Sequence, residues 1–208
     1  MHIEIDDLPL WLPLGFEAVW PAALETLAPC DMPELLACAP EAAARSENVR
    51  AEVRNLLRVG GYRPTGRGKP ASEYLVRAAE EQGLPTINPA VDILNGVSYW
   101  SGIPISVVDL ELAQAPFSVR HGAVGEEYIF NPSGQTMRLE GLLCLCDAQG
   151  PCANAVKDSQ RTKTHAQTTR TFHILWAPRS VAETAQAAFA WYVAETEAAG
   201  AVVTTWPE

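Results

Sequence analysis

The chain has 208 residues, of which 48% are hydrophobic, and it carries a formal net charge of -10. This apolar content is enough to bury a substantial core, so the chain is not expected to be disordered as a whole. The negative charge argues against a protein that coats nucleic acid nonspecifically, because affinity for a phosphate backbone comes mainly from cations. No stretch reaches the roughly 18 apolar residues of a membrane span, and the charged opening MHIEIDDLPLWLP lacks the apolar run of a signal peptide. We therefore expect a cytoplasmic protein that binds neither DNA nor a membrane.

The first half of the chain mainly predicts helices. After an alternating, strand-like HIEID, the segments ALETLAP and PELLACAPEAAA are interrupted by prolines, which favours short or broken helices. Ser46 is followed by apolar residues at helical spacing up to Gly60, so a capped amphipathic helix is predicted there. Two further helices are predicted over residues 71–82 and 89–101, the second of them capped by Asn88.

The second half mainly predicts strands, because the apolar residues begin to alternate after residue 102. The predicted strands are PISVVDLE, PFSVRHG, EEYIF, QTMRLE, LLCLCD, ANAVKD and TFHILWA, with NPSG as a hairpin turn. A helix over residues 180–199 and a short strand, VVTTW, follow. This order predicts an α+β fold as one domain over residues 1–208, in which helices from the first half pack on a mainly antiparallel sheet from the second half.

The cysteines do not form a recognisable metal motif. Three of the five lie in LCLCDAQGPC, without the C-x-x-C spacing of a structural zinc site. Cys144 and Cys146 are two residues apart, so in a strand they face the same side and are expected to be small buried residues. No Walker loop, dinucleotide fingerprint, H-E-x-x-H or G-x-S-x-G element occurs either. We expect neither a metal nor a cofactor.

Eleven of the fifteen cations of this acidic chain lie in two short segments, residues 50–77 and 157–170. One interpretation is two solvated faces, which is the usual role of a single charge run. If the two segments meet in space, they form instead a local surface that attracts anions.

The second segment lies within VKDSQRTKTHAQTTR, whose only apolar residues are one valine and one alanine. Such a composition contributes little to a core, so the segment is either a solvated linker or a site that presents its donors to an anion. His121 and His165 also lie in polar surroundings, where an imidazole can donate or accept a proton.

A longer stretch, from NPAVDILNGVSYW to VGEEYIF, resembles the editing (B3/B4) domain of the bacterial phenylalanyl-tRNA synthetase β-subunit. That domain has an asparagine before V-D-I-x-N, then G-x-P, D-L, V-R and G-E in this order. The matching residues are Asn88, Val91, Asp92, Ile93, Asn95, Gly102, Pro104, Asp109, Leu110, Val119, Arg120, Gly125 and Glu126. The resemblance extends over most of residues 46–177, and nothing in the chain resembles the other domains of the synthetase.

In the synthetase this domain hydrolyses the ester between tRNA and a wrongly attached amino acid. The resemblance therefore implies a B3/B4-like fold and a freestanding deacylase that acts in trans on the aminoacylated 3′ end of tRNA, with a synthetase as a second candidate partner. Ester hydrolysis needs an oriented water, donors for the oxyanion and a surface for phosphates. The expected catalytic residues are Lys157, Asp158, Ser159 and Glu126, and the expected substrate-binding residues are Arg161, Lys163, Thr164, Arg63, Arg67, Lys69, Asn95, Ser106 and His121.

Two positions depart from the synthetase pattern. Ser106 stands where the synthetase has a histidine, and residues 157–161 replace a glycine-rich turn. Both border the amino-acid pocket of the synthetase, so its specificity for tyrosine is not carried over. Two alternatives therefore stay open: a module that binds tRNA ends or an amino acid without hydrolysis, and a hydrolase of a small anionic ester or amide.

Overall fold

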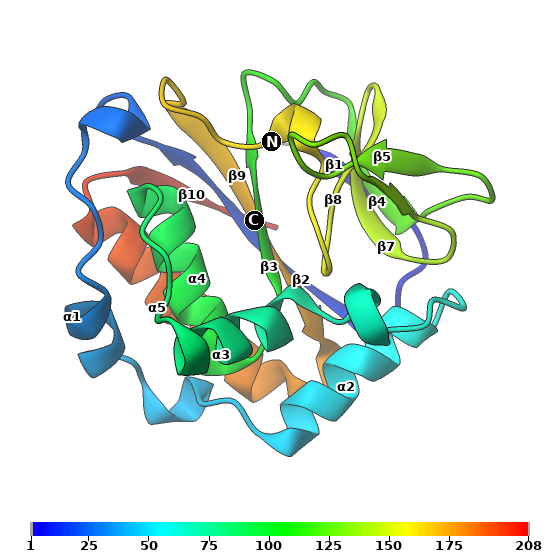
Figure 1. Cartoon of the computed structure of the whole chain (residues 1–208), viewed down its shortest axis with the longest axis horizontal. Helices are drawn as coiled ribbons and strands as arrows, with labels where there is room; N and C mark the ends of the chain where they lie inside the picture. The colour runs from blue at the N-terminus through cyan, green and yellow to red at the C-terminus, as the bar shows by residue number, and fades with distance from the viewer. Residues whose placement is uncertain (1, 208) are drawn as a thin grey trace.

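The computed structural model describes residues 2–207, and its longest strands form a sheet that crosses the centre of the molecule (Figure 1). This first sheet is antiparallel throughout and has the order β10-β2-β9-β3. Its strands are β10 (Val202–Trp206), β2 (Trp11–Val19), β9 (Arg170–Pro178) and β3 (Ile105–Asp109). Strands β2 and β9 pair along their whole length, so residues near the two ends of the chain meet in one sheet.

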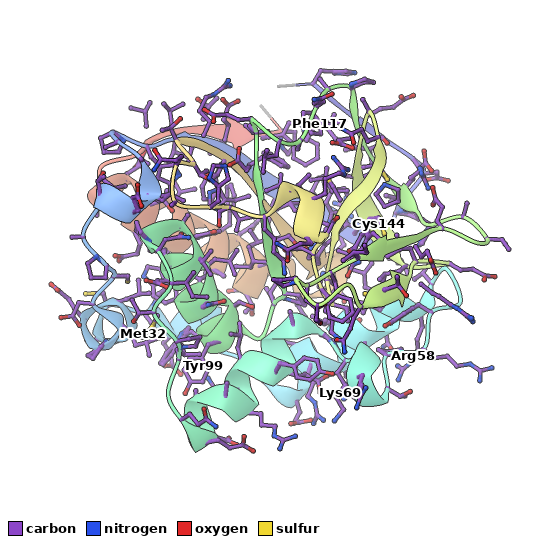
Figure 2. The ribbon with its side chains drawn as sticks, turned by 45° about the horizontal axis from the view of Figure 1, so that its top comes forward. Met32, Arg58, Lys69, Tyr99, Phe117 and Cys144 are labelled. Carbon is purple, nitrogen blue, oxygen red and sulfur yellow. The ribbon has the colours of Figure 1, made fainter. Side chains whose placement is uncertain are left out.

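A second four-stranded sheet has the order β1-β4-β7-β8 and is antiparallel except between β1 and β4. Its strands are β1 (Ile3–Ile5), β4 (Phe117–His121), β7 (Leu143–Asp147) and β8 (Gly150–Asn154). Cys144 lies within this sheet (Figure 2), and both Cys144 and Cys146 are buried, which confirms their predicted role. A separate hairpin joins β5 (Glu127–Ile129) to β6 (Thr136–Arg138) around the turn predicted at NPSG.

Helices cover the first sheet. Helices α4 and α5 pack against each other and on the strands of this sheet, while α3 lies against α4 (Figure 1). The helices are α1 (Met32–Ala37), α2 (Glu47–Arg58), α3 (Ala71–Glu81), α4 (Pro89–Ser101) and α5 (Ala182–Ala198). Short 3-10 turns are η1 (Leu24–Thr26), η2 (Glu41–Ala43), η3 (Gly66–Gly68), η4 (Gln160–Thr162) and η5 (Arg179–Val181). Within residues 2–207, no helix combines the length and the apolar character needed to cross a bilayer.

The predicted caps fix the ends of α2 and α4. The Ser46 hydroxyl accepts a hydrogen bond from the Val49 amide, and the Asn88 side chain accepts one from Val91. Such bonds satisfy amides that the first turn of a helix leaves free. Gly102 ends α4 in a left-handed conformation, with φ of 72°, which glycine adopts without a steric penalty.

The predicted α+β fold, with early helices and mainly antiparallel strands, is confirmed. Two details differ: the strands form two four-stranded sheets and a hairpin rather than one sheet, and β2 covers residues 11–19, where no strand was predicted. The strand predicted over residues 153–158 was wrong, because β8 ends at Asn154. There the Asn154 side-chain oxygen accepts hydrogen bonds from the amides of Val156 and Lys157, which turns the chain out of the sheet.

Candidate functional site

A cavity of about 640 Å³ is lined by residues of α3, α4, β3 and the loop that follows β8. This volume is typical of sites for small ligands. Most of its lining is apolar: Ala71, Tyr74, Leu75, Ala78, Pro85, Ile87, Val91, Leu94, Ile105, Val107 and Val156. The polar lining residues are Arg67, Asn95, Asn154, Lys157, Asp158, Lys163 and Thr164. We call this space the apolar cavity.

Asp158 is held in the wall of the apolar cavity by two donors. Its Oδ1 accepts hydrogen bonds from the Ser106 hydroxyl at 2.7 Å and from the Asn154 amide at 3.1 Å. Ser106 is itself buried and fixed, because its Oγ accepts a hydrogen bond from the Trp176 indole at 2.9 Å. Oδ2 of Asp158 has no hydrogen-bond partner among residues 2–207. Ser106 therefore positions the carboxylate through one oxygen and leaves the other available.

Burial raises the pKa of the Asp158 carboxyl to about 7, against the opposing effects of the Ser106 and Asn154 hydrogen bonds and the Lys163 charge. A carboxyl with this pKa exchanges its proton close to neutral pH. General bases in enzymes work best when their pKa lies near the operating pH.

Two lysines contact Phe130, which follows β5 at the edge of the hairpin. The Lys163 ammonium donates a hydrogen bond to the Phe130 carbonyl at 2.6 Å. The Lys157 ammonium lies 4.1 Å from the centre of the Phe130 ring, in a cation–π contact. Burial lowers the pKa of Lys163, although the charge of Asp158 acts in the opposite direction. Both lysines line the apolar cavity. Because each ammonium group carries three N–H bonds, both groups still have N–H donors available to a ligand.

Asn95 presents an amide to the apolar cavity from α4. Its exposed fraction is 8%, and its side chain forms no hydrogen bond with residues 2–207. Buried amides are rarely left without a partner, so this group is available to a ligand. Thr164 lies nearby in the fold, where its hydroxyl accepts a long hydrogen bond, 3.4 Å, from the Asn88 side chain.

A second cavity, of about 660 Å³, adjoins the first and shares Arg67 and Lys157 with it. It is formed by the η3 loop and the β5–β6 hairpin, which add the Tyr62 and Phe130 rings and the Arg138 guanidinium. We call this space the basic cavity. The two cation-rich segments thus meet, because Arg67 comes from the first and Lys157 from the second. Arg138, which lies outside both segments, was missed by the sequence analysis.

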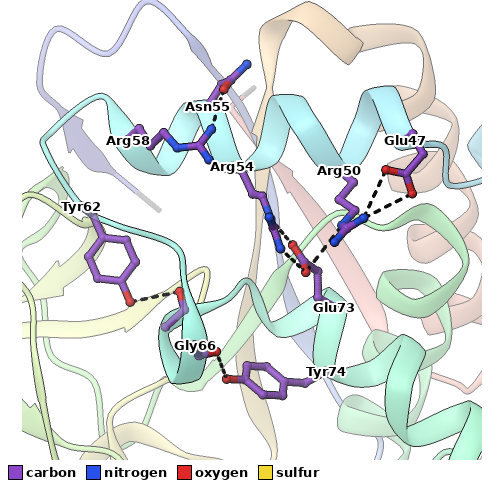
Figure 3. Close-up of polar contacts among 10 residues, drawn as sticks. Glu47, Arg50, Arg54, Asn55, Arg58, Tyr62, Gly66, Glu73 and Tyr74 are labelled. Carbon is purple, nitrogen blue, oxygen red and sulfur yellow. Dashed lines mark hydrogen bonds and ion pairs between the residues drawn. The ribbon is translucent and has the colours of Figure 1, made fainter.

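Most other cations of the two segments are bound by carboxylates. Figure 3 shows Glu73 of α3 between Arg50 and Arg54 of α2, with the closest contact 2.6 Å. Arg77 and Arg170 have their own carboxylate partners, Glu81 and Glu17. Arg50 and Arg54 therefore link α2 to α3 through Glu73, and neither lines the apolar or the basic cavity.

Several predicted catalytic or binding residues lie outside both cavities. Arg161 forms two hydrogen bonds with Asp147, at 2.7 and 2.8 Å. Burial disfavours the ionised form of Asp147, but these bonds outweigh it and lower the pKa of that carboxyl. Ser159 is buried, and its hydroxyl accepts the Arg161 amide at the start of η4. These residues hold the loop in place.

Glu126 and His121 also lie outside the apolar and basic cavities. Two hydrogen bonds from Arg120, 2.7 and 2.8 Å long, lower the pKa of Glu126. His121 lines a separate cavity of about 30 Å³ beside Asp7, and burial lowers its pKa. Arg63 and Lys69 flank Arg67 but line neither cavity. The structure therefore brings together Lys157, Asp158, Lys163, Thr164, Arg67 and Asn95, with Ser106 behind Asp158.

The comparisons with known proteins identify the family of the chain. The family's model matches residues 64–190, a stretch that contains every residue lining the apolar cavity, so the chain belongs to the B3/4 domain family. Within residues 2–207, no group of three or more His, Cys, Asp or Glu side chains is placed to hold a metal ion.

The chain is similar to two further proteins, one by sequence and one by structure. The phenylalanine–tRNA ligase β-subunit of Xanthomonas euvesicatoria pv. vesicatoria (strain 85-10) is 32% identical over 82 residues, which are 39% of this chain and 10% of that subunit. The chain thus spans about a tenth of this relative. A crystal structure of an N-terminal fragment of the phenylalanyl-tRNA synthetase β-subunit from Pyrococcus horikoshii matches 57% of this chain and 45% of the fragment, with 12% identity and a TM-score of 0.44.

Proposed function

We propose that this protein hydrolyses the ester bond of aminoacyl-tRNA in trans, with the aminoacyl group bound in the apolar cavity. One observation carries the proposal: Asp158, with a pKa of about 7 and a free Oδ2, lies in the wall of a largely apolar cavity. Membership of the B3/4 family supports it, because a relative is a phenylalanine–tRNA ligase subunit.

The proposed reaction uses water as the nucleophile. Oδ2 of ionised Asp158 removes a proton from the water, whose oxygen attacks the carbonyl carbon of the ester. The ammonium groups of Lys157 and Lys163 donate to the developing oxyanion, a type of stabilisation that accounts for much of the rate gain in such reactions. The bond between the carbonyl carbon and the ribose oxygen then breaks, and protonated Asp158 returns its proton to that oxygen.

The 3′ end of the tRNA is proposed to lie in the basic cavity. Arg67 and Arg138 are exposed there, and neither has a carboxylate partner within residues 2–207. They can therefore contact phosphate, and the Tyr62 and Phe130 rings can contact a base. Because Lys157 borders both cavities, an ester bond at their junction has the amino acid on one side and the terminal adenosine on the other.

A hydrolase of a small anionic ester or amide is the second candidate. It is favoured by the ion pairs, since Arg50, Arg54, Arg77, Arg161 and Arg170 all contact carboxylates and leave few cations for a long phosphate backbone. Salt dependence separates the two candidates, because several phosphate contacts give a steep fall in affinity with ionic strength and a single carboxylate contact does not.

The test is the release of amino acid from a panel of tRNAs, each charged with a cognate or near-cognate amino acid. The purified protein is compared with Lys157→Ala and Asp158→Asn, and with Asp6→Asn as a matched control at an exposed carboxylate. We expect hydrolysis of a subset of the panel by the wild type and the control only. Absence of hydrolysis across the panel by the folded wild type would overturn the proposal.

A further inference from the structure

We infer that the amino acid accepted by the apolar cavity has a large apolar side chain that carries no hydroxyl or other polar group. The inference rests on the proposed function, since it concerns the amino acid of the same ester. It follows from how the polar and apolar side chains are distributed over the elements that line the cavity.

The walls formed by α3 and β3 offer almost no hydrogen bonds. Leu75 and Ala78 of α3 and Ile105 and Val107 of β3 all line the cavity, and none of them carries a polar atom in its side chain. Among the α3 and β3 residues that line the cavity, Tyr74 alone carries a hydroxyl, and this hydroxyl donates to the Gly66 carbonyl at 3.1 Å (Figure 3). A polar side chain buried against α3 and β3 therefore loses its water without gaining a donor.

Four of the seven polar side chains that line the cavity match what every aminoacyl ester has in common. Asp158, Lys157 and Lys163 lie on the loop after β8, where the proposed hydrolysis uses them. The free amide of Asn95 is the only polar side chain that α4 contributes to the lining, and its oxygen suits the substrate ammonium. These groups recognise the ammonium, the carbonyl and the ribose oxygen, so they do not select among side chains.

Selection among amino-acid side chains then depends on contact with the apolar lining of the cavity. Removal of apolar surface from water favours large side chains, and a hydroxyl placed on the same surface remains without a partner. A hydrophobic pocket rejects an analogue that only adds a hydroxyl by at most about 100-fold. We therefore expect phenylalanine to bind about 10- to 100-fold more tightly than tyrosine, and valine more tightly than threonine by a similar factor.

The experiment uses adenosine analogues in which a 3′-amide replaces the ester, so that binding is measured without hydrolysis. Dissociation constants are determined by calorimetry for the phenylalanyl, tyrosyl, valyl and threonyl analogues. Val107→Thr adds a hydroxyl to the wall and is expected to reduce the preference for valine over threonine several-fold. Val202→Thr, at an exposed position of β10, is the matched control and is expected to leave the preference unchanged.

Equal or tighter binding of the tyrosyl and threonyl analogues would overturn the inference, and so would the absence of binding by all four. The same four amino acids are then tested as esters on tRNA. Binding with the expected preference but without hydrolysis would contradict the proposed deacylase and leave the side-chain inference standing. Hydrolysis that favours the tyrosyl or threonyl ester would support the proposed deacylase and contradict the side-chain inference.

Discussion

Two aspartates next to the strands of the second sheet have opposite environments. Asp147 ends β7 and receives two hydrogen bonds from Arg161, which lower the pKa of its carboxyl. Asp158 follows β8 and receives a hydroxyl and an amide but no arginine, and burial raises its pKa to about 7. The first is a structural ion pair, and the second is a carboxylate that can take up and release a proton in a cavity.

The comparison shows how one polar loop serves two purposes. Arg161 and Ser159 turn inward and fix the loop, whereas Lys157 and Lys163 border the apolar cavity. Charge composition alone does not separate these roles, because all four residues lie within seven positions of the sequence. The two roles are distinguished by what each side chain contacts in the folded structure.

The largest expected effect is that of Asp158→Asn on hydrolysis. The amide keeps the shape and the contact with Ser106 but cannot accept the proton of water, so we expect a loss of at least about 100-fold in kcat/KM on the best ester of the panel. The melting temperature, measured by differential scanning calorimetry, should not fall. A variant that keeps near-normal activity would show that Asp158 is not the base.

Arg161→Ala should affect stability instead. It leaves the fully buried side chain of Asp147 without its cation, and breaking a buried ion pair typically costs 3 to 5 kcal/mol; because Arg161 is 31% exposed, we expect about 2 to 3 kcal/mol in urea unfolding. Arg77→Ala, which removes an exposed pair, should cause no measurable change and serves as control. A stable Arg161→Ala protein with lost hydrolysis would place Arg161 in the site.

Arg67→Ala and Arg138→Ala together should weaken tRNA binding by about tenfold in low salt, because both side chains are free to contact phosphate. The slope of the logarithm of affinity against the logarithm of salt concentration should become shallower by about 0.7 for each arginine lost. Titration of labelled tRNA at several ionic strengths measures both quantities. An unchanged slope would favour the small-ester hydrolase.

The smallest expected effect concerns pH. Hydrolysis requires ionised Asp158, so kcat/KM should rise with pH through a midpoint at about pH 7. The charge of Lys163 lowers the pKa of Asp158, and Lys163→Ala should therefore move the midpoint of the profile to higher pH. A profile that stays flat between pH 5 and 8 would mean that no group of this pKa takes part.

Local signals made the helices and part of the site predictable. The caps Ser46 and Asn88 and the stop at Gly102 act within a few residues of the chain, and they could be read directly. The polar loop was expected to contribute little to a core; Lys157 and Asp158 do lie half-buried at a cavity, but Ser159, Thr162 and Thr168 are buried.

Long-range pairing could not be predicted in the same way. The pairing of β2 with β9 joins residues about 160 positions apart, and no local pattern in WLPLGFEAV specifies that partner. The sequence likewise could not show that Glu73 binds Arg54 or that Phe130 meets Lys157. These contacts decide which of the eleven clustered cations remain free, so the basic cavity became visible only in the fold.

The most direct test of the central claim is a crystal structure of the protein with the phenylalanyl 3′-amide analogue of the tRNA terminus. We expect the phenyl group between α3 and β3, the amide carbonyl near Lys157 and Lys163, and the adenosine in the basic cavity beside Tyr62. An analogue bound elsewhere, or bound with its adenosine in the apolar cavity, would contradict the proposed binding of aminoacyl-tRNA.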